Sequence, residues 1–228
     1  MIEKELKYLI SKLDYLKLRE YFEEYGEEKK IIYIKTYYYD TIPFTLLPDV
    51  VFRVRVNENT EQIFLSVKAN IKGRLENEIS SELQVAKELN YEINNLKIDK
   101  IEKQFPLSKD ILKNIGLNED VISFINEFKK DLNIRQDYLE LLGINEIERL
   151  HGKILFYNMP FDLDYTKYYD IKNPEKIFED YELEVEDESP DKFVSIVQSI
   201  FKQKEINSLG SEKKIRRLLK YLTPHDNL

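Results

Sequence analysis

The sequence predicts an α+β protein in which an antiparallel β-barrel with a charged interior carries helices on its outside. Three observations lead to this prediction. Charged residues occupy every second position of several strand-like segments, short strand-like segments follow one another closely, and residues 82–145 carry apolar residues at helical spacing. A chain of 228 residues fits one large domain over residues 1–228, with a helical insert at about 82–145.

The alternation of charge begins at the N-terminus. In a strand over residues 2–10, Glu3, Glu5 and Lys7 share one face, because successive side chains of a strand point to opposite faces. Taken alone, this pattern also fits an ordinary surface strand whose charges meet water. It recurs in three further segments, which contain Arg53 and Arg55, then Arg74 with Glu76 and Glu78, then Glu182 with Glu184 and Glu186. Four such strands favour a barrel with a charged interior.

The other expected strands are rich in β-branched and aromatic residues, with turn residues between them. In the first half of the chain they cover about residues 30–40, 50–57, 62–69 and 73–80. In the second half they cover about residues 146–157, 160–167 and 180–187, and each of these carries charge at alternate positions. The close succession of the first group is typical of an antiparallel meander.

Apolar residues at a spacing of three to four predict helices outside the insert over residues 11–25, 190–204 and 211–222. Ser11 is the expected N-cap of the first of these helices, and Gly26 is its expected end. Within the insert, Asn118 is the expected N-cap of a central helix and Gly143 the expected end of a third.

Composition excludes several classes of site. The net charge of −8 argues against a broad nucleic-acid-binding surface, because phosphate contacts require a clustered basic face. The chain has no cysteine and two histidines, which excludes disulfides, thiolate metal sites and a histidine-rich metal site. Any metal would therefore be held by carboxylates. The first residues do not resemble a signal peptide and no run of 18 apolar residues occurs, so we expect a soluble, cytoplasmic protein without a membrane partner.

Charges of both signs inside one barrel must pair, be hydrated or bind a charged ligand, because burying an uncompensated charge is costly. Carboxylate oxygens suit Mg²⁺ or Mn²⁺, and the candidates are Glu3, Glu5, Asp164, Glu182 and Glu184. Arginine and lysine suit phosphate oxygens, and the candidates are Arg53, Arg55, Lys68, Arg74 and Arg149. Together these groups describe a site for a metal-bound polyphosphate. The alternative is an interior lattice of ion pairs without a ligand.

Seven motifs follow one another along the chain: Glu-x-Glu-x-Lys at the N-terminus, Arg-x-Arg, a Val-Lys strand, Arg-x-Glu-x-Glu, Leu-Asp, Glu-Leu-Glu and a basic C-terminal helix. This order resembles the CYTH superfamily, the triphosphate tunnel metalloenzymes. The resemblance covers nearly the whole chain. It implies an eight-stranded antiparallel tunnel that binds a triphosphate together with one or two Mg²⁺ or Mn²⁺ ions.

The resemblance also implies roles for individual residues. The implied metal ligands are Glu3, Glu5, Asp164, Glu182 and Glu184. The implied phosphate-binding residues are Lys7, Arg53, Arg55, Lys68, Arg74, Arg149 and, from the C-terminal helix, Lys213 or Lys214. The implied catalytic residues are Lys7, Arg55, Lys68, Arg74, Glu76 and Glu78, where the two glutamates orient basic groups or water. Two departures stand out: Ser-Glu-Lys-Lys-Ile-Arg-Arg replaces the usual Ser-Lys-Tyr, and Ile147 stands where many relatives carry a second basic residue.

The expected activity is metal-dependent hydrolysis of the terminal phosphoryl group of inorganic triphosphate or a related triphosphate, with the charge of the transferred group neutralised by the metal and basic side chains. The same resemblance admits a class IV adenylate cyclase, a thiamine triphosphatase or a polyphosphate polymerase. A non-catalytic polyphosphate-binding module is the alternative from another class, which the two Glu-x-Glu pairs argue against. The expected partner is a small triphosphate-containing molecule, and a homodimer is the candidate assembly.

Overall fold

The computed structural model describes residues 2–41, 46, 50–70, 83–93, 96, 98–171 and 175–222. The side chains of residues 2, 3, 69, 70, 83–87 and 222 are not part of this description. The predicted strand at 73–80, with Arg74, Glu76 and Glu78, lies outside the described residues.

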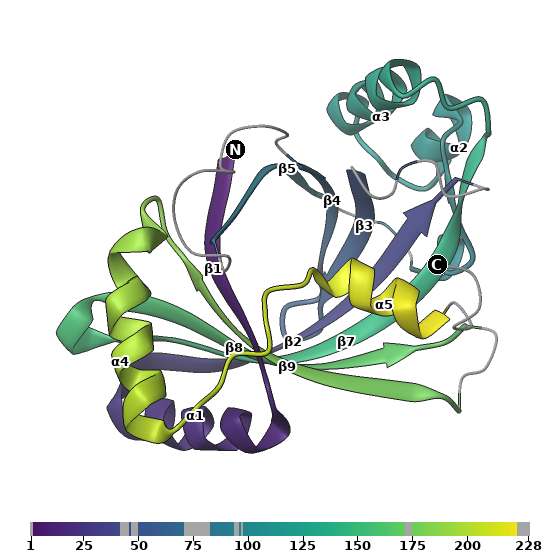
Figure 1. Cartoon of the computed structure of the whole chain (residues 1–228). Coiled ribbons are helices and arrows are strands. Elements are labelled where there is room, and N and C mark those ends of the chain that lie inside the picture. The colour runs from purple at the N-terminus through teal and green to yellow at the C-terminus, as the bar shows by residue number, and fades with distance from the viewer. Residues whose placement is uncertain are drawn as a thin grey trace.

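One sheet of nine strands forms the described fold, and all of its strand pairs are antiparallel (Figure 1). The strands are β1 (Ile2–Ile10), β2 (Gly26–Asp40), β3 (Val50–Asn57), β4 (Gln62–Asn70), β5 (Leu83–Glu92), β6 (Gln104–Pro106), β7 (Tyr138–Ile154), β8 (Met159–Tyr169) and β9 (Ile177–Glu186). Their order is β2-β3-β4-β5-β1-β9-β8-β7-β6, and β2 pairs in addition with β7. The α+β class and the antiparallel sheet are thus confirmed. The sheet has nine strands rather than eight, and a closed eight-stranded barrel stays a prediction.

The described helices are α1 (Lys12–Tyr25), α2 (Lys109–Asn114), α3 (Glu119–Asp131), α4 (Val194–Lys204) and α5 (Lys214–Leu222), with 3₁₀ turns η1 (Ile98–Lys100), η2 (Leu155–Tyr157) and η3 (Pro190–Phe193). Both predicted N-caps are confirmed. The side chain of Ser11 accepts a hydrogen bond from the backbone N–H of Asp14, and Asn118 accepts one from that of Val121. Each cap satisfies a backbone donor that the first helical turn leaves without a partner. None of the helices in the described part of the chain has the length and apolar character that a membrane span requires.

The predicted helical insert is wrong at both of its ends. Residues 83–92 form β5, which pairs with β4 and β1, and the residues from Tyr138 onward belong to β7. Short apolar runs fit a buried strand as well as a helix, and here the two neighbouring strands decide between them. Gly143 lies inside β7 and ends no helix. A Cβ at this position would come within 2.8 Å of the Leu218 side chain, so glycine allows α5 to approach the sheet closely.

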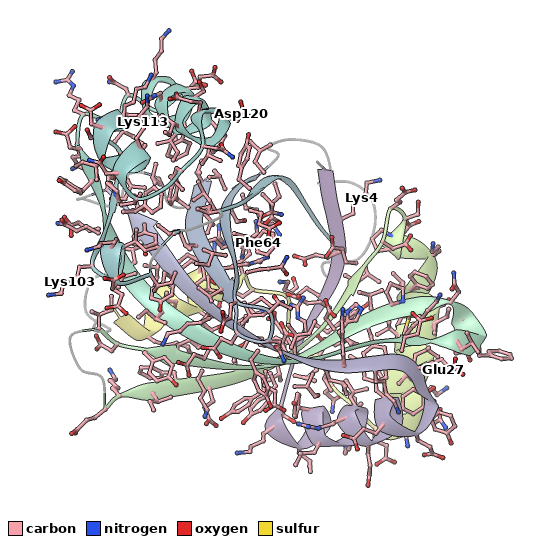
Figure 2. The ribbon with its side chains drawn as sticks, turned by 180° about the vertical axis from the view of Figure 1, so that it is seen from behind. Lys4, Glu27, Phe64, Lys103, Lys113 and Asp120 are labelled. Carbon is pink, nitrogen blue, oxygen red and sulfur yellow. The ribbon has the colours of Figure 1, made fainter. Side chains whose placement is uncertain are left out.

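Two large apolar clusters lie at opposite ends of the sheet, beneath different helices (Figure 1). The first contains Leu6 of β1 and packs under α1 and α4, and the second contains Val54 of β3 and packs under α3. Both of these side chains are fully buried. Seen from behind, charged side chains such as Lys103, Lys113 and Asp120 point outward from the surface (Figure 2). Because side chains alternate along a strand, the neighbours of Leu6 and Val54 point to the other face of the sheet, where the candidate site lies.

Candidate functional site

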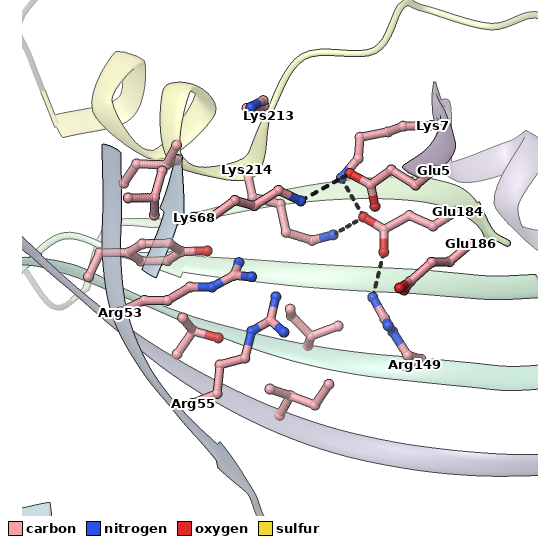
Figure 3. A pocket seen from close by; sticks show the side chains of 16 residues that line it. Glu5, Lys7, Arg53, Arg55, Lys68, Arg149, Glu184, Glu186, Lys213 and Lys214 are labelled. Atoms are coloured by element: carbon pink, nitrogen blue, oxygen red, sulfur yellow. Dashed lines mark hydrogen bonds and ion pairs between the residues drawn. The ribbon is translucent and has the colours of Figure 1, made fainter. Parts of the chain in front are cut away.

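A single pocket gathers most of the predicted site residues (Figure 3). Its charged lining consists of Glu5, Lys7, Arg53, Arg55, Lys68, Arg149, Glu184, Glu186, Lys213 and Lys214. Its remaining lining consists of Ile34, Thr36, Tyr38, Val51, Ile147 and Ile215. These residues come from β1, β2, β3, β4, β7, β9 and the beginning of α5, and Lys213 lies directly before that helix. The strand alternation predicted for β1, β3 and β9 therefore points the expected charges into one pocket.

The remaining predicted residues fall into two groups. Asp164 and Glu182 have no exposed surface and lie beside the pocket, in contact with residues that line it. The backbone of Glu3 lies in β1, but its side chain is not described, and Arg74, Glu76 and Glu78 lie outside the described residues. The proposed roles of these four residues, like those of the residues in and beside the pocket, stay predictions. Ile147 lines the pocket, so the departure seen in the sequence lies at the site itself.

Three buried carboxylates lie close enough to share a cation. One oxygen each of Asp164, Glu182 and Glu184 lie within 4.8 Å of one another. The sheet produces this arrangement, because Asp164 pairs with Glu182 across β8 and β9, and Glu184 follows two residues later on the same face of β9. An all-oxygen, carboxylate-rich donor set suits Mg²⁺ or Mn²⁺. The residues present thus fit the metal that the family resemblance implies.

Four basic side chains surround these carboxylates. Lys7 Nζ lies 2.5 Å from Glu184 Oε1 and 3.3 Å from Glu5 Oε1. Arg149 binds Asp164 with two nitrogens, Nε to Oδ1 and Nη2 to Oδ2, both at 2.7 Å. Lys214 Nζ lies 3.0 Å from both Asp164 Oδ2 and Glu184 Oε1 and also contacts Glu182. The fourth basic side chain is Arg217, which is buried and whose Nη2 donates a hydrogen bond to Glu182 Oε2 at 2.5 Å. Each of the three acids is therefore paired with basic side chains, which come from three different elements, β1, β7 and α5.

The surrounding charges control the ionisation of the acids. Burial by itself would raise the pKa of Glu184, but Lys7 and Arg149 lower it well below its usual range. Burial likewise raises the pKa of Glu5, but the positive charges of Lys7 and Lys68 outweigh this effect. The pKa of Glu5 is therefore also lowered. Glu186 behaves in the opposite way, because burial and the charges of Glu5 and Glu184 raise its pKa. Glu5 and Glu184 thus remain anionic and able to bind cations well into the acidic range.

The opposite wall of the pocket carries basic groups for an anion. Arg53 Nη2 donates to Glu88 Oε1 at 2.9 Å, and Lys68 Nζ lies 3.5 Å from Glu5 Oε1. The Arg55 side chain is 37% exposed, against 9% for Arg53 and 12% for Lys68. Of these three cations, Arg55 is therefore the most accessible to a ligand that enters the pocket.

Three residues of the site were not predicted from the sequence. Glu88 is buried and receives hydrogen bonds from Arg53 and Ser66, but it lies in the segment expected to be helical. Asp162 accepts a hydrogen bond from Arg149 at 2.6 Å, and its position two residues before Asp164 was the available signal. Arg217 binds Asp180 as well as Glu182 and is buried, and its signal was its position one helical turn after Lys214.

Comparison with known proteins places the chain in a family. A family model of the CYTH domain matches residues 1–219. HpAC1 from Hippeastrum, a candidate adenylyl cyclase reported to have a dominant triphosphatase activity, has a similar structure: the TM-score is 0.72 at 17% identity, over 98% of each chain. A candidate adenylate cyclase from Bacillus halodurans gives a TM-score of 0.60 at 20% identity, over 93% of this chain and 95% of that one.

PH1012 from Pyrococcus horikoshii gives a TM-score of 0.51 at 16% identity, over 92% of this chain and 94% of that one. At these identities the similarities describe the fold alone. No curated protein sequence matches the chain.

Proposed function

The chain belongs to the CYTH domain family, and we propose that it is a metal-dependent triphosphatase that hydrolyses the terminal phosphoryl group of inorganic triphosphate within the charged pocket. One observation carries this proposal: a triad of buried carboxylates and a wall of arginine and lysine side chains meet at the same pocket. The acids suit a divalent cation and the bases suit phosphate oxygens. The triphosphatase activity reported for HpAC1 supports the same choice.

The pairing of strands supports a tunnel around this pocket. Each strand from β2 to β7 in the sheet order pairs with the next, and β2 also pairs with β7 along most of its length. We propose that these eight strands enclose the pocket, with β6 added outside the ring. Strand walls that exclude bulk water strengthen electrostatic interactions with a bound phosphate.

The acids and bases have separate roles in the proposed reaction. Asp164, Glu182 and Glu184, with Glu3 and Glu5 from β1, would hold Mg²⁺ or Mn²⁺, which when bound neutralises charge on the phosphoryl oxygens. The phosphate chain would lie along Lys7, Arg53, Arg55, Lys68, Arg149 and Lys213, with Arg74 as a further contact. Because these groups are positioned before the substrate arrives, they stabilise the negative charge of the transferred group without reorganisation.

We expect inorganic triphosphate to react better than ATP, by at least several-fold in kcat/KM. Tyr38 is the single aromatic side chain among the described lining residues, so the pocket offers no pair of rings between which a base could stack. The test is release of orthophosphate from inorganic triphosphate, ATP and thiamine triphosphate with Mg²⁺ or Mn²⁺. A preference for ATP would contradict the proposal, and cyclic AMP among the products would support the cyclase alternative.

Lys213 makes phosphate binding depend on pH. Burial and the neighbouring charge of Lys68 lower the pKa of Lys213 to about 8. The side chain therefore loses its positive charge as the pH rises through this value, and affinity for triphosphate should fall with it. We expect the Kd of the wild-type protein to rise more steeply between pH 7 and pH 9 than that of Lys213→Met, as measured by calorimetry. Parallel curves for the two proteins would show that Lys213 does not contact the phosphate.

The alternation along β3 predicts opposite effects for two neighbouring residues. Arg55→Ala should weaken triphosphate binding about tenfold to a hundredfold, since one charge-assisted contact contributes roughly 1.5–3 kcal/mol, with little loss of stability. Val54 is fully buried in the cluster under α3, so Val54→Ala should lower the free energy of unfolding by roughly 1.5–3 kcal/mol and leave KM unchanged. Urea denaturation and steady-state kinetics on both variants distinguish the two effects. The reverse outcome would mean that the face assignment of β3 is wrong.

A further inference from the structure

Lys214 occupies the place that a divalent cation would need. Its ammonium nitrogen lies 3.0 Å from Asp164 Oδ2 and from Glu184 Oε1, and it also contacts Glu182. Among the described residues, these three acids form the group whose carboxylate oxygens lie close enough together to hold a metal. The side chain of Lys214 is 9% exposed, so its charge has little access to water. Figure 3 shows it reaching Glu184 from the beginning of α5.

The ammonium and a divalent cation exclude each other from this position. Mg²⁺ binds its oxygen ligands at about 2.0–2.1 Å, which requires the same carboxylate oxygens that Lys214 now contacts. Two cations at such short range repel strongly where water is excluded. A metal can therefore enter only if the ammonium of Lys214 moves away.

The structure provides a destination for the displaced ammonium. Lys214 also lines the pocket, and its four-carbon stem can turn without moving the helix. The helix has anchors of its own, because Arg217 binds Asp180 and Glu182, and Leu218 is fully buried against Gly143. The pocket that receives the ammonium is the one that would hold the triphosphate, whose charge would stabilise it there.

We propose that Lys214 is an exchangeable counter-ion of the metal site: it compensates the carboxylate triad while no metal is bound, and on metal binding it turns into the pocket toward the phosphates. The inference rests on the proposed metal site. Two consequences follow. The protein without triphosphate binds metal weakly, because the metal must displace Lys214. Triphosphate strengthens metal binding, because it stabilises the displaced ammonium, and the two ligands are thereby coupled.

The direct test is Mn²⁺ binding to the whole chain in the absence of triphosphate, followed by electron paramagnetic resonance. Lys214→Met should bind Mn²⁺ about tenfold more tightly than wild type, within the usual range of coupling between two charged ligands. Lys213→Met is the matched control, because it removes the same charge from the adjacent residue, whose side chain Figure 3 shows apart from Glu184. Its Mn²⁺ affinity should change less than about threefold, as expected for a charge at longer range. Unchanged or weaker Mn²⁺ binding by folded Lys214→Met would overturn the proposal.

A second measurement uses the wild-type protein and does not depend on the variant folding. Labelling of lysines with acetic anhydride, read by mass spectrometry, should increase at Lys214 when Mn²⁺ is added and stay constant at Lys220, which is exposed on the same helix. Equal labelling of Lys214 with and without bound Mn²⁺ would overturn the proposal. Assays of phosphate release on the same samples separate the two ideas. A protein without triphosphatase activity that still shows both Lys214 effects would contradict the proposed function alone.

Discussion

Replacement of Glu184 by glutamine should lower kcat/KM for inorganic triphosphate by about a hundredfold or more, because a bound metal and its ligands stabilise the transition state by several kcal/mol. Glu184 is a member of the carboxylate triad and contacts Lys7, Arg149 and Lys214. Glutamine keeps the shape of the side chain and removes its charge. The fold should survive, because Asp164 remains as a partner for both Arg149 and Lys214.

The measurement is steady-state phosphate release with Mg²⁺ or Mn²⁺, together with circular dichroism to confirm folding. Glu5→Gln should act in the same direction, and excess chelator should abolish the activity of the wild-type protein. Glu179→Gln is the control on the same strand, because Glu179 contacts Tyr165 and Tyr181 outside the pocket. Near wild-type activity of Glu184→Gln, or full activity in chelator, would show that the triad does not hold a catalytic metal.

Arg217→Ala should lower the free energy of unfolding by about 3–5 kcal/mol, because removing one partner of a buried ion pair leaves the other charge uncompensated. Arg217 is buried, and its guanidinium binds Asp180 and Glu182 at 2.5 Å and also contacts the Tyr168 hydroxyl. Its loss would leave two buried carboxylates with fewer partners and remove a main attachment of α5 to the sheet.

Urea denaturation of Arg217→Ala and Lys220→Ala makes the comparison within one helix. Lys220 pairs with Glu212 at the surface, where an ion pair contributes about 0–1 kcal/mol. Equal stability of the two variants would mean that the buried cluster around Arg217 contributes no more than a surface ion pair.

The strand alternation was the part of the site that the sequence predicted best. Because side chains alternate strictly along a strand, Glu5 and Lys7 had to share a face once β1 was recognised, and so did Arg53 and Arg55. The structure brings all four into one pocket. The same reasoning failed for residues 83–92, since Leu83, Val85 and Leu89 fit a helical stripe as well as a strand, and the choice depends on pairing with β4 and β1.

The part that the sequence could not predict depends on how α5 docks. Lys213 and Lys214 are adjacent, and nothing in their order shows which one faces the pocket and which one reaches the carboxylates. The structure gives both a place at the pocket and brings Lys214 into contact with Glu184. Arg217 was missed for the same reason, because its partners lie on elements distant in the sequence, whereas Glu88 was missed because its strand was expected to be a helix.

The measurement that tests the central claim most directly is phosphorus nuclear magnetic resonance of inorganic triphosphate incubated with the whole chain and Mg²⁺ or Mn²⁺. If the charged pocket is a triphosphatase site, the triphosphate signals should be replaced by those of pyrophosphate and orthophosphate in equal amounts, and the reaction should stop when chelator is added. Triphosphate that stays intact with either metal, although calorimetry shows that it binds, would mean that the pocket holds polyphosphate without hydrolysing it.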